Sequence, residues 1–181
     1  MLISTLNVAN AGPRVRGNGG QAYGCVTADT LITLANGKEI TISSLKSGDI
    51  VVNRNLDKVQ VFYTLKGPEN KQMYSIETES GKKIKATEGH PFYSSVGLVA
   101  TKNLKIGNEV LTVNGFEKIV NLSTFDFNGE VYNLAAANIE NAMDVNLESS
   151  DPFLGLTSNE HSVILNGFIT GDVIIQRLLA M

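Results

Sequence analysis

Cysteine is nearly absent from this sequence, because Cys25 is the only one among 181 residues. A single cysteine excludes an internal disulfide and any metal cluster built from several cysteines. The lone thiol is then either an inert, buried group or a reactive one. We expect no cofactor and no bound metal ion.

Long basic runs and long apolar runs are missing as well. The net charge is −3, and the 15 Lys and Arg residues form no basic run longer than Lys82-Lys83, so we expect no nucleic-acid partner. No stretch approaches the roughly 20 apolar residues of a membrane-spanning helix, and residues 1–6 lack the charged start of a secretory signal. With 43% apolar and 18% charged residues, we predict one soluble, monomeric domain, with a cytoplasmic location favoured.

Turn dipeptides divide the chain after residue 25 into short segments rich in β-branched residues. Two-residue hairpin turns need a positive φ, which Asn and Gly tolerate. The dipeptides are Asn36-Gly37, Ser80-Gly81, Asn114-Gly115, Asn128-Gly129 and Asn166-Gly167. We predict an all-β fold with strands at residues 30–34, 38–42, 49–53, 59–65, 73–78, 83–87, 110–113, 117–122, 131–134, 162–165 and 168–170.

A weak internal repeat accompanies these strands. The heptapeptide Leu-Lys-Ser-Gly-Asp-Ile-Val at residues 45–51 returns as Leu-Lys-Ile-Gly-Asn-Glu-Val at residues 104–110. Two related halves would make a pseudo-symmetric β fold. The alternative is a coincidence between two common turn sequences.

One motif surrounds the cysteine. Residues 24–32, Gly-Cys-Val-Thr-Ala-Asp-Thr-Leu-Ile, followed by the segment 42–51, resemble the N-terminal motif of Hint domains, the fold of inteins and hedgehog-type autoprocessing proteins. The resemblance implies a pseudo-two-fold horseshoe of β-hairpins. It also implies that Cys25 attacks the carbonyl of Gly24 and converts that peptide bond into a thioester. A thiol is a strong nucleophile, and Gly24 offers an unhindered carbonyl.

A second motif lies at residues 81–92, Gly-Lys-Lys-Ile-Lys-Ala-Thr-Glu-Gly-His-Pro-Phe. It is similar to the Thr-x-x-His element of the same family. The resemblance implies that His90 acts as general acid toward the amide nitrogen of the scissile bond, with the hydroxyl of Thr87 hydrogen-bonded in the same site. A neutral histidine can donate a proton near physiological pH. The alternative is a structural loop histidine before a proline.

The third motif comprises residues 131–134 and 160–169 and is similar to the paired C-terminal strands of Hint domains. It implies that His161 assists cleavage at the far junction, whereas the alternative is a satisfied polar residue at a strand start. The family often has an acidic residue where Asn133 stands, so acid–base help from this position is not expected. Residues 135–160 replace a short family connection, and we interpret them as an inserted surface loop.

The end of the match departs from the intein pattern. Inteins end with His-Asn before a Cys, Ser or Thr, whereas Gly171, Asp172 and Val173 stand here. The aspartate lacks the amide nitrogen that closes a succinimide ring, and valine carries no nucleophile, so we do not expect standard splicing. Asp172 remains a candidate catalytic residue by position.

Together these motifs predict a processing domain at residues 25–172. Residues 1–24 are an arm or upstream extein-like segment, and residues 173–181 are a short helix, a docking segment or a vestige of a host. The resemblance implies single-turnover autocatalytic cleavage of the flanking polypeptide in cis, with water or a small thiol as acceptor. The alternatives are a degenerate Hint domain that serves as a structural or interaction module, and atypical splicing. If the catalytic interpretation holds, Cys25, Thr87, His90 and His161 should converge.

Overall fold

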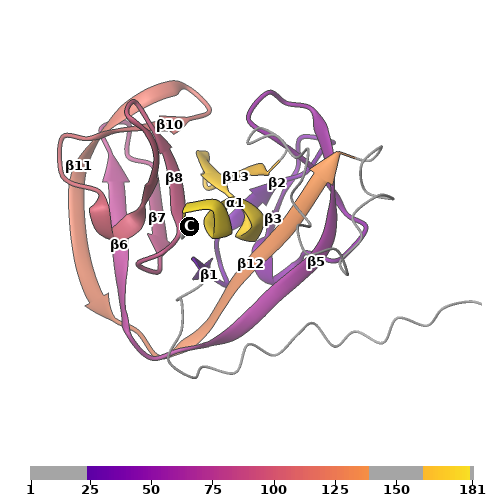
Figure 1. Ribbon diagram of the computed structural model, residues 1–181, viewed down its shortest axis with the longest axis horizontal. Coiled ribbons are helices and arrows are strands. Elements are labelled where there is room, and N and C mark those ends of the chain that lie inside the picture. The colour runs from indigo at the N-terminus through magenta and orange to yellow at the C-terminus, as the bar shows by residue number, and fades with distance from the viewer. Residues whose placement is uncertain (1–23, 139–160, 180–181) are drawn as a thin grey trace, which may run out of the picture.

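Antiparallel strands make up most of the computed structural model, which describes residues 24–138 and 161–179 (Figure 1). The strands are β1 (Val26–Thr27), β2 (Leu31–Thr33), β3 (Glu39–Thr41), β4 (Ile50–Val52), β5 (Lys58–Glu69), β6 (Gln72–Thr78), β7 (Lys83–Ala86), β8 (Pro91–Ser94), β9 (Gly97–Ala100), β10 (Glu109–Thr112), β11 (Gly115–Asp126), β12 (Gly129–Asn138), β13 (Ser162–Leu165) and β14 (Phe168–Gly171). Two 3-10 helices, η1 (Ile42–Ser44) and η2 (Thr101–Asn103), and one α-helix, α1 (Val173–Leu179), complete the described elements. The all-β prediction is confirmed.

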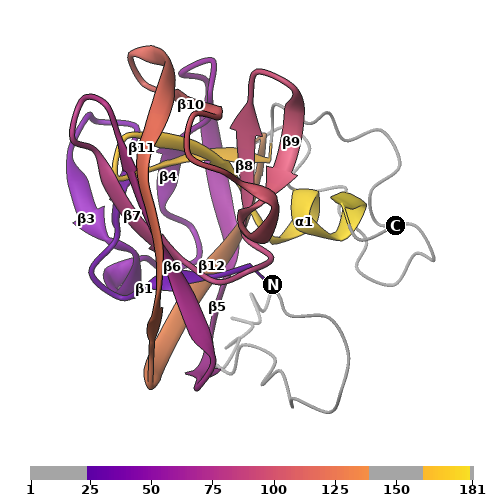
Figure 2. The same cartoon turned by 90° about the vertical axis from the view of Figure 1, so that its left-hand side faces the viewer.

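The order of the strands shows the pseudo-two-fold arrangement. One stretch of the sheet runs β10-β11-β6-β7-β1-β12-β5-β4, so that two four-stranded halves meet where β7 pairs with β1. The other stretch runs β3-β2-β13-β14-β8, with β9 on β8, and its centre is the β13–β14 hairpin. In Figure 1 the β6–β11 half and the β5–β12 half lie on opposite sides of α1. Figure 2 shows the same helix from the side. This is the horseshoe that the sequence predicted.

The repeated heptapeptides adopt the same turn in both halves. Gly48 and Gly107 have φ values of +93° and +89°, which glycine adopts without steric cost. Each donates its amide hydrogen to a carbonyl of the following long strand at 2.8 Å. The side chains of Asp49 and Asn108 each accept from the amide three residues earlier, at 2.8 and 2.9 Å. The repeat is therefore structural and not a coincidence.

The core continues from the sheet into helix α1. Phe92 and Phe168 meet edge to face with ring centroids 5.9 Å apart, and they belong to a buried cluster drawn from both halves. Val173 and Ile174 are buried against Leu65 and Ala135 of the β5–β12 pair. The first turn of the predicted C-terminal tail thus contributes to the core as a helix.

The structure differs from the predicted insertion at its start. Strand β12 continues to Asn138, and Ala135, Ala136 and Ala137 are fully buried while β12 pairs with β5. Three alanines carry little β propensity, which is why the pattern favoured a loop, but burial between neighbouring elements overrides that preference. Residues 139–160 lie outside the described part of the chain, as do residues 1–23.

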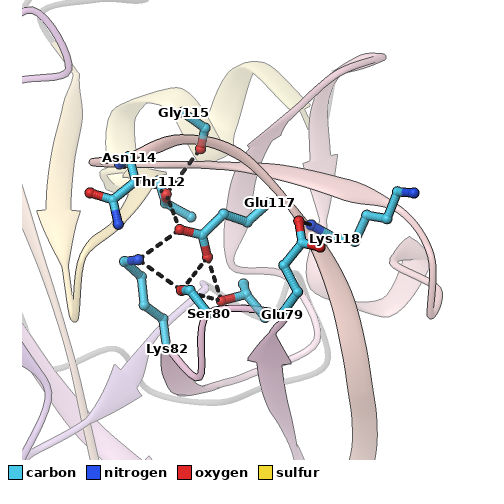
Figure 3. A network of polar contacts seen from close by, with 9 residues as sticks. Glu79, Ser80, Lys82, Thr112, Asn114, Gly115, Glu117 and Lys118 are labelled. Carbon is cyan, nitrogen blue, oxygen red and sulfur yellow. Dashed lines mark hydrogen bonds and ion pairs between the residues drawn. The ribbon is translucent and has the colours of Figure 1, made fainter.

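A buried carboxylate ties together the turns of the β6–β11 half (Figure 3). Glu117 accepts hydrogen bonds from the hydroxyls of Thr78 and Ser80, both at 2.6 Å, from Lys82 Nζ at 2.7 Å and from the Thr112 hydroxyl at 3.0 Å. Burial opposes ionisation of this carboxyl, but the hydrogen bonds from Lys82, Ser80, Thr78 and Thr112 outweigh it and lower its pKa to about 2.

Glu117→Gln is expected to lower the free energy of unfolding at pH 7 by about 2 kcal/mol, because hydrogen bonds to a charged group are the stronger ones. The matched control is Glu130→Gln, whose ion pair with Lys66 has side chains 54% and 61% exposed and should matter little. Because the folded pKa of Glu117 lies below its usual value, its contribution is present above pH 4.5 and is lost as the pH falls toward 2. Equal losses in both variants by chemical denaturation would contradict this assignment.

Candidate functional site

The Gly24–Cys25 bond lies between the two halves of the sheet. Val26 pairs with Tyr132 and Thr27 with Val131, and extending this antiparallel register by one residue places Cys25 opposite Asn133. On the other side, the Thr87 amide donates to the carbonyl of Cys25 at 2.9 Å. Cys25 is buried in an apolar cluster with Met73 and Val131. The predicted scissile bond is therefore held where β1 meets both β7 and β12.

Side chains distant in sequence hold both polar ends of this peptide bond. The Cys25 amide donates to Thr87 Oγ1 at 2.8 Å, across 62 positions of chain. The Gly24 carbonyl accepts a hydrogen bond from Asn133 Nδ2, across 109 positions. The other end of the Asn133 amide, Oδ1, accepts from the backbone amide of Leu134 at 2.7 Å. The bond is thus contacted at both its nitrogen and its carbonyl oxygen.

Backbone closely surrounds Gly24. A Cβ atom built on Gly24 would lie 2.2 Å from His90 Cα, 2.5 Å from His90 N and 2.7 Å from the carbonyl carbon of Gly89. These separations are far below van der Waals contact, and backbone atoms cannot move aside as a flexible side chain does. Position 24 accepts only glycine without rearrangement of the 89–90 backbone.

His90 is fully buried beside Gly24 and lies edge to face with Phe92 at 5.4 Å. Burial lowers its pKa to about 4, an effect that the nearby Gly24 carbonyl partly offsets. Neither ring nitrogen reaches a partner within the described residues at the geometry of an ordinary hydrogen bond. The ring is therefore neutral at pH 7 and can both accept and donate a proton.

The turn that carries His90 occurs twice in the fold. The His90 amide donates to the Thr87 carbonyl at 3.2 Å, and in the other half the Thr30 amide donates to the Thr27 carbonyl at 3.0 Å. The Thr-x-x-His backbone is therefore part of the pseudo-symmetric framework. What distinguishes the candidate site is the imidazole in place of the Thr30 hydroxyl.

The thiol of Cys25 is protonated at neutral pH. Burial, and then the negative charge of Glu69, raise its pKa to about 12. A buried thiol reacts only if a neighbouring group takes its proton. The neutral imidazole of His90, which also adjoins Gly24, is a base in the same site.

His161 and Asp172 form a second cluster where the β13–β14 hairpin begins and ends. His161 Nδ1 lies 3.0 Å from Asp172 Oδ2, which also accepts from the Ala136 amide at 2.9 Å. The other oxygen, Oδ1, accepts from the amides of Ile174 and Ile175 at 2.9 and 3.1 Å. Asp172 is thus the N-cap of α1, a favoured role for aspartate. Sequence reasoning saw its position in the family pattern but not this structural task.

The structure brings Cys25, Thr87 and His90 together around Gly24. His161 and Asp172 contact each other farther along strand β12, beside Ala136. Strand β12 links the two clusters, since Asn133 contacts Gly24 and Ala136 contacts Asp172. Sequence reasoning did not expect a contact from Asn133. The signal for it is the register of β1 on β12, which only the paired strands reveal.

In residues 24–138 and 161–179, no three His, Cys, Asp or Glu side chains are grouped so as to hold a metal ion. None of the helices described is long and apolar enough to span a membrane.

Comparison with known proteins places more than half of the chain in a family. The family model described as the pretoxin HINT domain matches residues 31–143, which include Thr87, His90 and Asn133. A DNA-directed RNA polymerase subunit Rpo1N of Methanocaldococcus jannaschii is 38% identical in an alignment of 96 residues that covers 48% of this chain and 7% of that protein. The chain therefore spans only a small part of the curated relative that it matches.

Solved structures share the fold at low identity. The gp41-1 intein is 20% identical with a TM-score of 0.63, over 83% of this chain and 99% of that chain. A DnaB intein from Synechocystis sp. PCC 6803 is 20% identical with a TM-score of 0.63, over 82% and 98%. A bacterial intein-like domain from Clostridium thermocellum is 20% identical with a TM-score of 0.62, over 81% and 97%. Because the family model covers more than half of the sequence, the chain belongs to the pretoxin Hint-domain family, within the wider Hint and intein fold.

Proposed function

We propose that this chain is a self-processing domain that forms a thioester at Gly24–Cys25 by an N-to-S acyl shift and then releases residues 1–24. The observation that carries the proposal is the double contact on this one bond, from Thr87 to its nitrogen and from Asn133 to its oxygen. The adjoining neutral imidazole supplies acid–base chemistry in a buried site. The substrate is the flanking polypeptide in cis.

The acyl shift balances without a cofactor. The proton of the Cys25 thiol passes to His90, and the sulfur bonds to the carbonyl carbon of Gly24. The bond from that carbon to the Cys25 nitrogen breaks, and the proton ends on this nitrogen, which becomes a free amine. Thr87 holds the nitrogen in place through its hydrogen bond. Water or a small thiol then attacks the thioester, so that residues 1–24 leave and the Cys25 thiol is restored.

We propose that the acceptor approaches this bond from a surface pocket beside it. Its lining includes Thr87, which contacts the Cys25 amide, and Glu69, whose charge acts on the Cys25 thiol. The far junction supports cleavage without ligation, because Val173 offers no nucleophile and the carboxylate of Asp172 is occupied by four contacts. We keep residues 25–172 as the processing domain, with α1 as a continuation of its core.

Incubation of the folded chain with dithiothreitol is expected to yield residues 1–24 and residues 25–181, separated by intact mass. Cys25→Ala should abolish the cleavage, because no other thiol exists in the chain. His90→Ala should slow it by roughly 10²- to 10⁴-fold, the usual loss for a general acid or base. A wild type that stays intact for days while folded contradicts the proposal.

The pH dependence of the first step adds a sharper readout, measured where the rate no longer depends on thiol concentration. With His90 as base, the reacting pair is thiol and neutral imidazole, which persists between the pKa values of about 4 and about 12. The wild-type rate should therefore be flat across neutral pH and fall near pH 4. Without His90, the rate should rise about tenfold per pH unit, because only the thiolate then attacks.

One observation favours a second candidate function, a degenerate Hint domain that serves as a structural or interaction module. The thiol pKa of about 12 makes Cys25 unreactive unless His90 accepts its proton. If the folded wild type stays intact in dithiothreitol at every pH tested, Cys25 is an ordinary buried thiol and this candidate holds.

A further inference from the structure

We propose that Asn133 is the catalytic residue that stabilises the oxyanion of this reaction. Its Nδ2–H binds the negative charge that develops on the Gly24 carbonyl oxygen as Cys25 attacks. The inference rests on the proposed acyl shift and names the group that lowers its barrier.

The contact already exists before the reaction. Asn133 Nδ2 donates to the Gly24 oxygen, and Oδ1 accepts from the Leu134 amide at 2.7 Å. The second bond fixes the orientation of the side-chain amide, because a flipped amide would oppose two oxygens at Gly24 and two hydrogens at Leu134. Asn133 is 2% exposed, so water does not compete for either end. A fixed donor in a buried site stabilises developing charge without reorganisation.

The other half of the fold shows that the framework does not require this amide. The β12–β5 pair and the β11–β6 pair each contain one bulge. Counted from that bulge, Ser75 of β6 has the position that Asn133 has in β12. Ser75 pairs with Lys85 in the same way that Asn133 lies opposite Cys25. A serine therefore suffices for the same backbone where no scissile bond is present. The side chain at this position therefore differs between the halves, and the amide occurs in the half that contacts Gly24.

The chemical class of the residue also fits the task. A neutral amide donates a hydrogen bond to an oxyanion, whereas an ionised carboxylate at the same place would repel it. Position 133 is where the family often carries an acid, so this chain has a donor where an acid would have been expected. The proposed role is therefore charge stabilisation and not proton transfer.

The kinetic test uses two variants and a matched control, with the first step measured by mass at saturating dithiothreitol. Asn133→Ala should slow cleavage about 10²- to 10³-fold, the loss typical of one oxyanion donor. Ser75→Ala, at the equivalent position, should cleave at the wild-type rate. Asn133→Asp keeps the shape of the side chain, and its rate relative to wild type should fall as the pH rises from 4 to 9, because only the protonated carboxyl donates.

A second measurement reads the contact itself in the intact precursor. With ¹³C in the glycine carbonyls and ¹⁵N in cysteine, only the Gly24–Cys25 pair gives a carbonyl-to-amide correlation, because the chain has one cysteine. Loss of the hydrogen bond in Asn133→Ala should move the Gly24 carbonyl resonance upfield, and Ser75→Ala should leave it in place. This readout does not depend on cleavage.

The outcomes separate the two proposals. If the wild type cleaves and requires Cys25 but Asn133→Ala is equally fast, the oxyanion role is overturned and the acyl shift stands. A relative rate of Asn133→Asp that increases with pH also overturns it, since that would indicate a base at position 133. Slow cleavage of Asn133→Ala with an unmoved carbonyl resonance indicates a structural effect alone. A wild type that forms no thioester refutes both.

Discussion

Gly24→Ala is expected to reduce thiol-induced cleavage by about 10²-fold or more, because a displacement of about 1 Å at the reacting centre already costs that much. The added methyl group would lie 2.2 Å from His90 Cα and 2.5 Å from His90 N. Either the scissile carbonyl leaves the Asn133 donor or the 89–90 backbone shifts and takes the imidazole with it. Both responses disturb groups that the proposed reaction needs together.

The matched control for this prediction is Gly67→Ala. Gly67 lies in β5, and nothing approaches within 4 Å of a Cβ built there. This variant should cleave at the wild-type rate and melt within a few degrees of the wild type. If Gly24→Ala cleaves as fast as Gly67→Ala, the backbone around position 24 yields readily and does not select glycine.

Because backbone atoms restrict position 24 to glycine, the proposed reaction is restricted in the residue that can precede Cys25. A pocket made of side chains can be enlarged by one substitution, but the barrier here consists of the main chain of Gly89 and His90. The residue before the cysteine is therefore restricted by the same turn that carries His90, the proposed acid–base residue. In the proposed reaction, specificity and acid–base chemistry would share one structural element.

Local signals predicted much of this fold, because turn dipeptides and β-branched runs act over a few residues. The hairpin at Asn166-Gly167 illustrates this, with φ values of +50° and +79° at the predicted turn. The repeat likewise predicted two halves, and the conserved turn geometry at Gly48 and Gly107 follows from it. Strand ends were less predictable, as the alanines of β12 show, because their burial depends on partners far along the chain.

The candidate site also has some features that local sequence motifs indicate and others that depend on distant contacts. The motif pattern indicated Cys25 and His90, because residue type and spacing carry that information. The contact of Asn133 with Gly24 depends on strand register across 109 positions, which no local pattern encodes. The helix-capping role of Asp172 depends on a helix at residues 173–179 whose first turn is buried, and that burial is a property of the assembled core.

Asp172→Ala is expected to lower the free energy of unfolding by about 4 kcal/mol, from the loss of an N-cap and of the acceptor for two further buried groups. The two further groups are the Ala136 amide and His161, which both contact Oδ2. Because a domain of this size loses about 2–4 °C per kcal/mol, the melting temperature should fall by roughly 10 °C. A loss below about 1 kcal/mol by chemical denaturation would show that α1 does not depend on this cap.

Asp172→Asn separates the capping role from chemistry at the junction. The Asn side-chain oxygen can still accept from Ile174 and Ile175, but its NH₂ group would then face the Ala136 amide hydrogen, so an intermediate loss of stability is expected. The asparagine restores the amide that closes a succinimide ring, yet Val173 still offers no acceptor and Gly171 still stands where inteins have a histidine. Mass spectrometry should therefore detect no spliced product. Any release of the segment after residue 172 should be slow. Joined flanks from this single variant would refute the account of why the far junction does not support splicing.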